Sequence, residues 1–381
     1  MADTVSGSLI QGVLVRTARI TALAAAGALI VGLSASASTS LAAGPDSRIG
    51  EAAKSAPTAR SDIGLYGAQD PTYDGVYRQS YALMGLVVSD ARVPGPAVSW
   101  LLGQQCADGS FMSYRADTSL PCPPSDPDTY SGPDTNSTAL ALAALTAVGE
   151  TGAAGAAADW LLEQQARGGG FPYYAGGAPD TNSTGLVMAA LKVVDGTSKQ
   201  RRNAANFERR MAFGCSAEAD QVGGMPYMAE MLPDAISTSQ ALLGLSRAFL
   251  VREQTQRRAN PSVSCDEKGL VENVKGATAR WLARALRAND GRLPDAFDPE
   301  ATDWNSTAIA IIGLVSARTA GIATDRAIAA LADNINDYVG SDSGDRPAAL
   351  GTAILAAVAT GSNPRDFGQR DLVADLQATR Q

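Results

Sequence analysis

Histidine is absent from this sequence of 381 residues. Because histidine is the usual catalytic base and a frequent metal ligand, its absence excludes Ser-His and Cys-His catalytic pairs and every zinc site that needs an imidazole. Aromatic residues are also few, at 6%, although 45% of the residues are hydrophobic. A large core is therefore expected to consist mainly of alanine and leucine.

Positive charge is also scarce. The chain has 31 Lys and Arg residues against 39 Asp and Glu residues, which gives a net charge of −8 at pH 7 and a pI near 4.8. Nucleic acids and anionic membrane surfaces attract basic proteins. The sequence therefore predicts neither of them as a partner.

Charged residues are missing from a stretch near the N-terminus. After Arg16 and Arg19 the run ITALAAAGALIVGL is apolar, and small residues follow it. The run is shorter than the ~20 residues that span a bilayer, so it predicts a secretory signal peptide over residues 1–42, then a linker over 43–63 and one domain over 64–381. A cleaved signal predicts a secreted or cell-envelope protein. The alternative is an uncleaved signal that anchors the chain to a membrane.

Cysteines number only four. Export to an oxidising compartment favours disulfides, and four cysteines allow three pairings. Pairing of sequence neighbours, Cys106 with Cys122 and Cys215 with Cys265, is the simplest assignment. Since no CxxC spacing occurs and no histidine can complete a zinc site, neither a metal nor a cofactor is expected.

A short polar cluster recurs along the chain. PDTNST begins at Pro133 and again at Pro179, and TDWNST begins at Thr302. An apolar run follows each copy, as it does in related segments that follow Asp234 and, more weakly, Asp74 and Asp345. Each run predicts a helix that is buried on nearly every side. One-faced surface helices lie between them, so the order of buried and surface helices repeats six times and predicts two concentric rings of helices.

Two further segments suggest a family. WLLGQQCADGSF (Trp100–Phe111) and WLLEQQARGGGF (Trp160–Phe171) resemble the prenyltransferase/squalene-cyclase repeat. The resemblance implies an all-α fold, an (α/α)6 toroid with six inner and six outer helices around a central cavity. It covers about Gly64 to the C-terminus. Members include terpene cyclases, β subunits of protein prenyltransferases, and cobalamin-binding domains, so the fold alone does not fix the function.

The chemical motifs of that family are missing. The chain has no DxDD and no DDxxD motif, and the nearest string, SDPDTY, lies in a proline-rich loop. The zinc site of protein prenyltransferases requires a histidine, and a complement-like thioester requires Cys-Gly-Glu-Gln, neither of which is present. Each chemistry that the resemblance implies therefore lacks its reacting group.

The repeated cluster has two interpretations. Asp134, Asp180 and Asp303 are suited to cap helices. Capping does not account for the recurrence of Asn-Ser-Thr, since these residues are mediocre helix formers. If the inner helices run parallel, their N-termini meet at one mouth of the toroid. We therefore expect a ligand-binding site there that also includes Asn136, Asn182, Asn305, Trp304, Tyr173 and Tyr174.

Three classes of function remain after these steps. The first is an exported protein that binds a small ligand at the mouth; corrinoid, isoprenoid and glycan are the candidate ligands. The second is a terpene-cyclase-like or glycan-active enzyme of the same fold, for which paired carboxylates are the requirement. The third is a structural or interaction module of the cell envelope. We expect the first, with no catalytic residue assigned.

Overall fold

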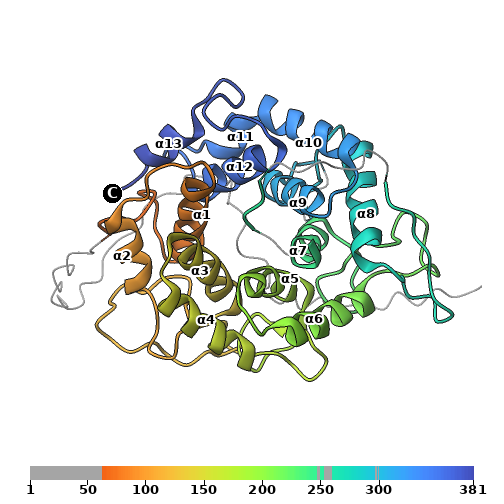
Figure 1. Cartoon of the computed structure of the whole chain (residues 1–381), viewed down its shortest axis with the longest axis horizontal. Helices are drawn as coiled ribbons and strands as arrows, with labels where there is room; N and C mark the ends of the chain where they lie inside the picture. Colours follow the sequence, from red (N-terminus) through yellow and green to blue (C-terminus); the bar gives the residue numbers. More distant parts are fainter. Residues whose placement is uncertain (1–61, 247–248, 253–259, 297, 299) are drawn as a thin grey trace, which may run out of the picture. The chain divides into compact units, whose positions relative to one another are not determined.

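Six helices that are apolar on nearly every face form an inner ring in the computed structural model (Figure 1). Each contacts the next one around the ring, and the last contacts the first, so the ring is closed. Burial on all sides explains why these helices carry alanine and leucine in place of a polar stripe. They are α1 (Gly75–Val88), α3 (Thr135–Val148), α5 (Thr181–Ala190), α7 (Ala235–Ser246), α9 (Trp304–Ser316) and α12 (Pro347–Thr360).

Six further helices lie outside this ring, each against one or two inner helices. They bury one face and expose the other, as amphipathic sequences require. They are α2 (Gly95–Gly103), α4 (Thr151–Glu163), α6 (Ser198–Met211), α8 (Val274–Ala288), α10 (Gly321–Asp333) and α13 (Leu372–Ala378). The predicted all-α (α/α)6 toroid is confirmed. Short elements occupy the connections: β1 (Phe171–Pro172), β2 (Pro179–Asp180), η1 (Leu191–Val193) and α11 (Ile335–Val339).

The structure describes residues 62–246, 249–252, 260–296, 298 and 300–381. All of them belong to one compact unit, Ile49–Gln381. The predicted signal peptide (1–42) and nearly all of the predicted linker (43–63) lie outside the described residues. Within the described ranges, no helix has the length and apolar character needed to cross a membrane.

Glycines bring neighbouring inner helices into backbone contact. A Cβ on Gly185 of α5 would lie 2.4 Å from the carbonyl oxygen of Gln240 in α7, and a Cβ on Gly244 would lie 2.3 Å from the oxygen of Gly185. Helices α12 and α1 meet in the same way, since a Cβ on Gly351 would lie 2.4 Å from the oxygen of Tyr81. Any larger side chain would push these helices apart. The inner ring is therefore tightly closed at these crossings.

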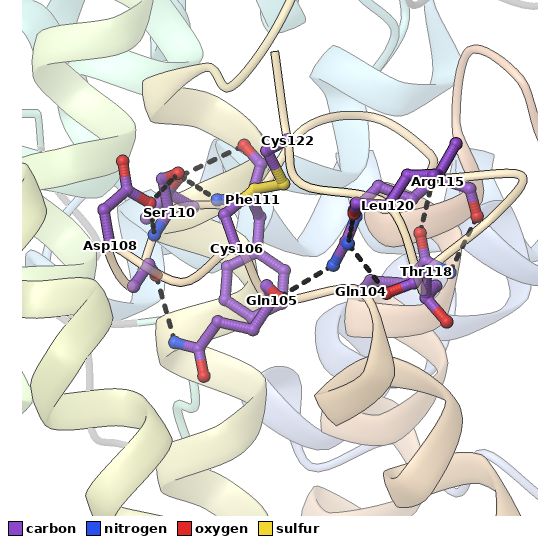
Figure 2. The surroundings of a disulfide bond; sticks show 12 residues. Gln104, Gln105, Cys106, Asp108, Ser110, Phe111, Arg115, Thr118, Leu120 and Cys122 are labelled. Atoms are coloured by element: carbon purple, nitrogen blue, oxygen red, sulfur yellow. Dashed lines mark hydrogen bonds between the residues drawn. A yellow bond between two sulfur atoms is a disulfide. The ribbon is translucent and has the colours of Figure 1, made fainter. Parts of the chain in front are cut away.

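Both predicted disulfides are confirmed. Cys106 pairs with Cys122 across a Cα–Cα distance of 5.7 Å, and Cys215 pairs with Cys265 across 6.1 Å. Figure 2 shows that Arg115 organises the loop closed by the first bond. Its guanidinium donates to the main-chain oxygens of Gln105, Thr118 and Leu120, at 2.8, 2.9 and 2.6 Å. The loop that leads from α2 to α3 is thus fixed by a covalent link and by hydrogen bonds from the Arg115 guanidinium.

Candidate functional site

The N-termini of the inner helices meet at one end of the ring, which we call the mouth. The loop that enters one inner helix also bonds the start of the preceding one. The oxygen of Tyr173, just before α5, accepts the N–H of Thr135 in α3 at 2.9 Å, and the oxygen of Tyr227, before α7, accepts the N–H of Thr181 in α5 at 3.1 Å. The predicted convergence of the repeated clusters at one end is therefore observed for neighbouring repeats.

The aspartates of the cluster cap helices. In α3, Asp134 accepts the N–H of Ser137 on Oδ1 at 2.7 Å and the Ser137 hydroxyl on Oδ2 at 2.7 Å. In α5, Asp180 accepts the same two groups of Ser183 at 2.7 and 2.8 Å. Asp303 differs, because its Oδ2 is buried without a hydrogen-bond partner. Capping therefore explains both the Asp and the Ser of the repeat.

The threonine of the cluster joins the cap to the preceding loop. The hydroxyl of Thr184 donates to the oxygen of Asp180 at 2.6 Å and accepts the N–H of Phe171 at 2.9 Å. Thr138 makes the same contacts with Asp134 and Phe111, at 2.7 and 2.9 Å. Phe111 and Phe171 are fully buried, so they pack the repeat. The threonine is thus structural as well.

Two weaker members of the repeat depart from this pattern. Asp74 stands at the cap position of α1 but makes no capping hydrogen bond, and it pairs with Arg78 at 3.2 Å. Asp345 does not cap α12 either: Arg346 occupies the cap position, and Asp345 pairs with Arg370. These two inner helices therefore begin without the Asp–Ser cap of the full repeat, and each aspartate forms an ion pair with an arginine instead.

The asparagine is the part of the cluster that capping does not use. In α9, Oδ1 of Asn305 accepts the hydroxyl of Tyr338 at 3.1 Å, and Asn305 also bonds the hydroxyl of Tyr77. Tyr77 belongs to α1, and α12 lies between α1 and α9 in the ring (Figure 1). The side chain of Asn305 therefore points to the inside of the ring, where these two tyrosines engage its amide.

Asn136 and Asn182 hold the position of Asn305 in α3 and α5, but their amides are not engaged in this way. The Oδ1 atoms of both are buried and have no hydrogen-bond partner in the described part of the chain. Asn136 is only 9% exposed, and Asn182 is partly exposed. A buried polar atom without a partner is costly. Among the described residues, the cluster atoms that are buried without a partner are these two amide oxygens, the hydroxyl of Thr181 and Oδ2 of Asp303.

Tyrosines gather beside these two asparagines; Tyr130, Tyr173, Tyr174 and Tyr227 are together called the tyrosine cluster. The rings of Tyr173 and Tyr174 meet edge to face at 4.7 Å, and those of Tyr130 and Tyr174 at 6.3 Å. The Tyr174 hydroxyl donates to the oxygen of Tyr130 at 2.8 Å. Tyr227 lies close enough to Tyr130 for the two hydroxyls to interact electrostatically. All four are at least partly exposed, so a ligand can reach them.

The structure separates the predicted site residues into groups. Asp134 and Asp180, Asn136 and Asn182, and Tyr173 and Tyr174 come together at the starts of α3 and α5. Asp303, Trp304 and Asn305 lie at the start of α9, on the other side of the ring. Trp304 is its first residue and is partly exposed. One side of the mouth therefore holds the unused amides together with the aromatic rings.

Burial controls the electrostatics of this side. It raises the pKa of Asp134 to about 7 and that of Asp180 to about 7, although the bonds from Ser137 and Ser183 oppose the change. Burial also raises the pKa of Tyr173 well above its usual value, and the carboxyls of Asp134 and Asp180 add to the effect. Near neutral pH these two aspartates thus lie close to half ionisation.

One functional candidate is missing from the sequence interpretation. Glu208 of α6 is fully buried, and neither of its carboxyl oxygens has a hydrogen-bond partner within the described ranges. Burial first, and the Asp180 carboxyl second, raise its pKa well above the usual value. The residue follows Phe207 where other outer helices have Trp-Leu, as at Trp100-Leu101. Alignment of the outer helices on this pair would have revealed it.

Two surface hollows lie away from the mouth. One of about 440 Å³ is lined by residues such as Asn336, Gln369 and Arg370, and one of about 410 Å³ by residues such as Asp290 and Arg326. No inner-helix residue lines either of them. The large central cavity that the family resemblance implies is thus not among them. Within the described ranges, no three acidic or cysteine side chains converge as metal ligands would.

Comparisons with known proteins bear on the fold. No protein-family model matches the chain, and no curated protein matches it. Solved structures do. A protein from Actinoplanes aligns with a TM-score of 0.50 and 14% identity, over 78% of this chain and 93% of its own. A type II terpene cyclase from Scytonema, in complex with geranylgeranyl dihydroxybenzoate, aligns with a TM-score of 0.49 and 13% identity, over 78% and 92%.

A glycosidase is a third similar structure, with a TM-score of 0.46 and 16% identity over 79% of this chain and 93% of its own. At such identities the likeness concerns the α/α toroid fold alone. The function therefore has to be argued from the residues at the mouth.

Proposed function

We propose that this protein binds a small polar ligand at the mouth of its helix ring, on the side formed by α3 and α5. The observation that carries the proposal is the pair of amide oxygens, Oδ1 of Asn136 and of Asn182, which are buried without a partner among the described residues. The equivalent Asn305 satisfies its amide with tyrosine hydroxyls. A ligand that contacts the two unused amides would remove the cost of leaving them unpaired.

Binding is favoured over catalysis by the state of the aspartates. An acid–base enzyme acting on glycans needs two free carboxyl groups that flank the bond to be cleaved. Both carboxyl oxygens of Asp134 and of Asp180 accept hydrogen bonds from their capping serines. Of the three aspartates in the fully repeated cluster, Asp303 alone keeps an oxygen without a partner. A toroid enzyme is therefore the second candidate, and it would depend on Asp303.

The chemistry of the mouth also bears on the candidate ligands. An isoprenoid is an apolar chain, and it would need an apolar cavity to enclose it. Amides and phenol rings at an accessible edge suit a polar ligand with a limited apolar surface. Among the candidates, this favours a glycan or corrinoid-like polar molecule over an isoprenoid.

We place the protein outside the cytoplasm. Two observations support this: the signal-peptide pattern of residues 1–42 and the two disulfides, which are typical of proteins that mature in an oxidising compartment. N-terminal sequencing of the protein exported by its native host tests this. A first residue near position 43 is expected, and a cell-associated chain that retains Met1 would contradict it.

The function itself is tested by identifying what the protein carries. We expect mass spectrometry of protein exported by its native host to find a small molecule that the Asn136→Leu, Asn182→Leu double variant does not retain. Asn206 is exposed on α6, so Asn206→Leu is the matched control and should retain the molecule. Equal retention by all three proteins would remove the asparagines from the site. Turnover of a glycan that depends on Asp303 would favour the enzyme.

A further inference from the structure

The side of the mouth formed by α3 and α5 contains two buried carboxyl groups without a positive partner. Asp134 and Asp180 are each 1% exposed. Each accepts hydrogen bonds from its own serine, and no basic side chain among the described residues forms an ion pair with either one. Buried carboxylates are usually paired with a cation. At the start of α1 the aspartate does have a cationic partner, since Arg78 forms an ion pair with Asp74 at 3.2 Å.

Aromatic rings stand next to these two carboxyls. The main chain of Tyr174 forms an antiparallel β-bridge with Asp134, and strand β2, which follows it, ends at Asp180. Tyr173 and Tyr174 therefore lie between the two aspartates. The groups that act on the Tyr173 hydroxyl besides burial are Asp134, Tyr174, Asp180 and Tyr227. The faces of phenol rings carry negative potential and attract cations. Carboxyl groups and ring faces therefore favour the same sign of charge in a bound molecule.

The unused amides complete the surroundings. Asn136 is buried, with Oδ1 unpartnered, at the helical position where Asn305 points into the ring. Amide oxygens accept hydrogen bonds from ammonium groups. An anionic ligand such as a phosphate ester would meet two carboxyls and no basic partner, so its desolvation would be uncompensated. The acidic excess of the whole chain, with a net charge of −8, acts in the same direction.

We propose that the ligand held beside the tyrosine cluster is an organic cation, an amine or ammonium compound whose charged group sits between the rings and the carboxyls of Asp134 and Asp180. This inference rests on the proposed function and narrows its ligand class. The ammonium group donates to the amide oxygens of Asn136 and Asn182, and its alkyl part lies against Tyr173 and Tyr174.

The test uses two probes of equal length, n-butylammonium and n-butanol, in calorimetric titrations of the whole exported protein. We expect n-butylammonium to bind at least tenfold more tightly than n-butanol at pH 8. Binding should weaken severalfold at pH 5.5, where Asp134 and Asp180 are protonated, whereas n-butanol should show no pH effect. Tyr173→Leu should abolish the preference. Tyr73→Leu is the control, because Tyr73 is 70% exposed and lies outside the tyrosine cluster.

Burial first, and the Asp180 carboxyl second, also raise the pKa of Glu208, so the pH series is repeated with Glu208→Gln. If the pH effect on n-butylammonium binding persists in Glu208→Gln, it belongs to Asp134 and Asp180. If the effect disappears in this variant, its assignment to the two aspartates is overturned. Equal binding of the two probes overturns the cation inference. Binding of maltose, a neutral saccharide, in place of n-butylammonium also overturns the cation inference. If Asn136→Leu then abolishes the binding of maltose, the proposed function still stands. If no probe binds and no molecule co-purifies with the protein, both proposals fail.

Discussion

Replacing Asp180 with asparagine separates the capping role of this residue from its charge. At the start of α5, its Oδ1 accepts the N–H of Ser183 at 2.7 Å, and Oδ2 accepts the hydroxyl of Ser183 at 2.8 Å. Asparagine caps helices about as well as aspartate, and its amide oxygen can still accept the N–H of Ser183. The Asp180→Asn protein is therefore expected to keep its fold while losing one buried ionisable group.

The size of the effect follows from the titration of Asp180. Burial raises the pKa of this carboxyl from 3.8 to about 7. Between these values the folded protein keeps a proton that the unfolded chain releases, so the stabilisation is present below pH 3.8 and is lost as the pH rises through about 7. At about 1.4 kcal/mol per pH unit, the whole loss is on the order of 4 kcal/mol. Asparagine has no proton to release.

The assay is urea unfolding of both proteins between about pH 5 and pH 8. The difference in unfolding free energy should change in favour of Asp180→Asn by about 1.4 kcal/mol for each pH unit up to about 7, and should then level off. Asp134 and Glu208 remain in both proteins, so their titration largely cancels. Asp159→Asn, at an exposed site on α4, is the control and should show no such trend. Parallel curves would refute the reasoning, as would a loss of more than about 2 kcal/mol at every pH.

Three further substitutions test the architecture. Thr184→Val leaves the N–H of Phe171 without its partner at 2.9 Å, so urea unfolding should show a loss of about 1–3 kcal/mol; an unchanged midpoint would contradict this. Gly185→Ala places a Cβ 2.4 Å from the oxygen of Gln240, and the strain should lower the unfolding free energy by about 1–3 kcal/mol; a stability gain would be incompatible with the backbone contact. Glu208→Leu replaces a buried acid that has no partner among the described residues. The variant should gain about 1–3 kcal/mol of unfolding free energy, which thermal unfolding at neutral pH would show as a higher melting temperature. A lower melting temperature would show that the carboxyl group is needed for stability.

The toroid could be predicted because its signals are local and repeated. The apolar run that follows each Asp-x-Asn-Ser-Thr copy predicts a buried helix. The amphipathic segments between these runs predict the outer helices. The capping role of Asp134 and Asp180 was also open to prediction, because an N-cap depends only on residues within one turn. The disulfide pairs followed from the order of the cysteines along the chain and were confirmed.

The division of the mouth into used and unused asparagines could not be predicted. Asn305 is engaged by Tyr77 and Tyr338, which come from distant parts of the chain. Their meeting depends on which side chains of distant helices face one another inside the ring, and no local pattern encodes this. Tyr130 and Tyr227 join the tyrosine cluster through loops of irregular length. The path of such loops is fixed by tertiary contacts, so the aromatic part of the candidate site became visible only in the structure.

The central claim is tested most directly by the Asn136→Leu, Asn182→Leu double variant. Native mass spectrometry measures its ligand occupancy, and an unfolding experiment measures its free energy of unfolding. If the two amides serve a ligand, the variant should lose the bound molecule. Ligand-free, it should be as stable as the ligand-free wild type or more so, because a buried unpaired polar group has been replaced by an apolar one of similar volume. A variant that keeps the ligand but loses more than about 1 kcal/mol of stability would show that the asparagines are structural.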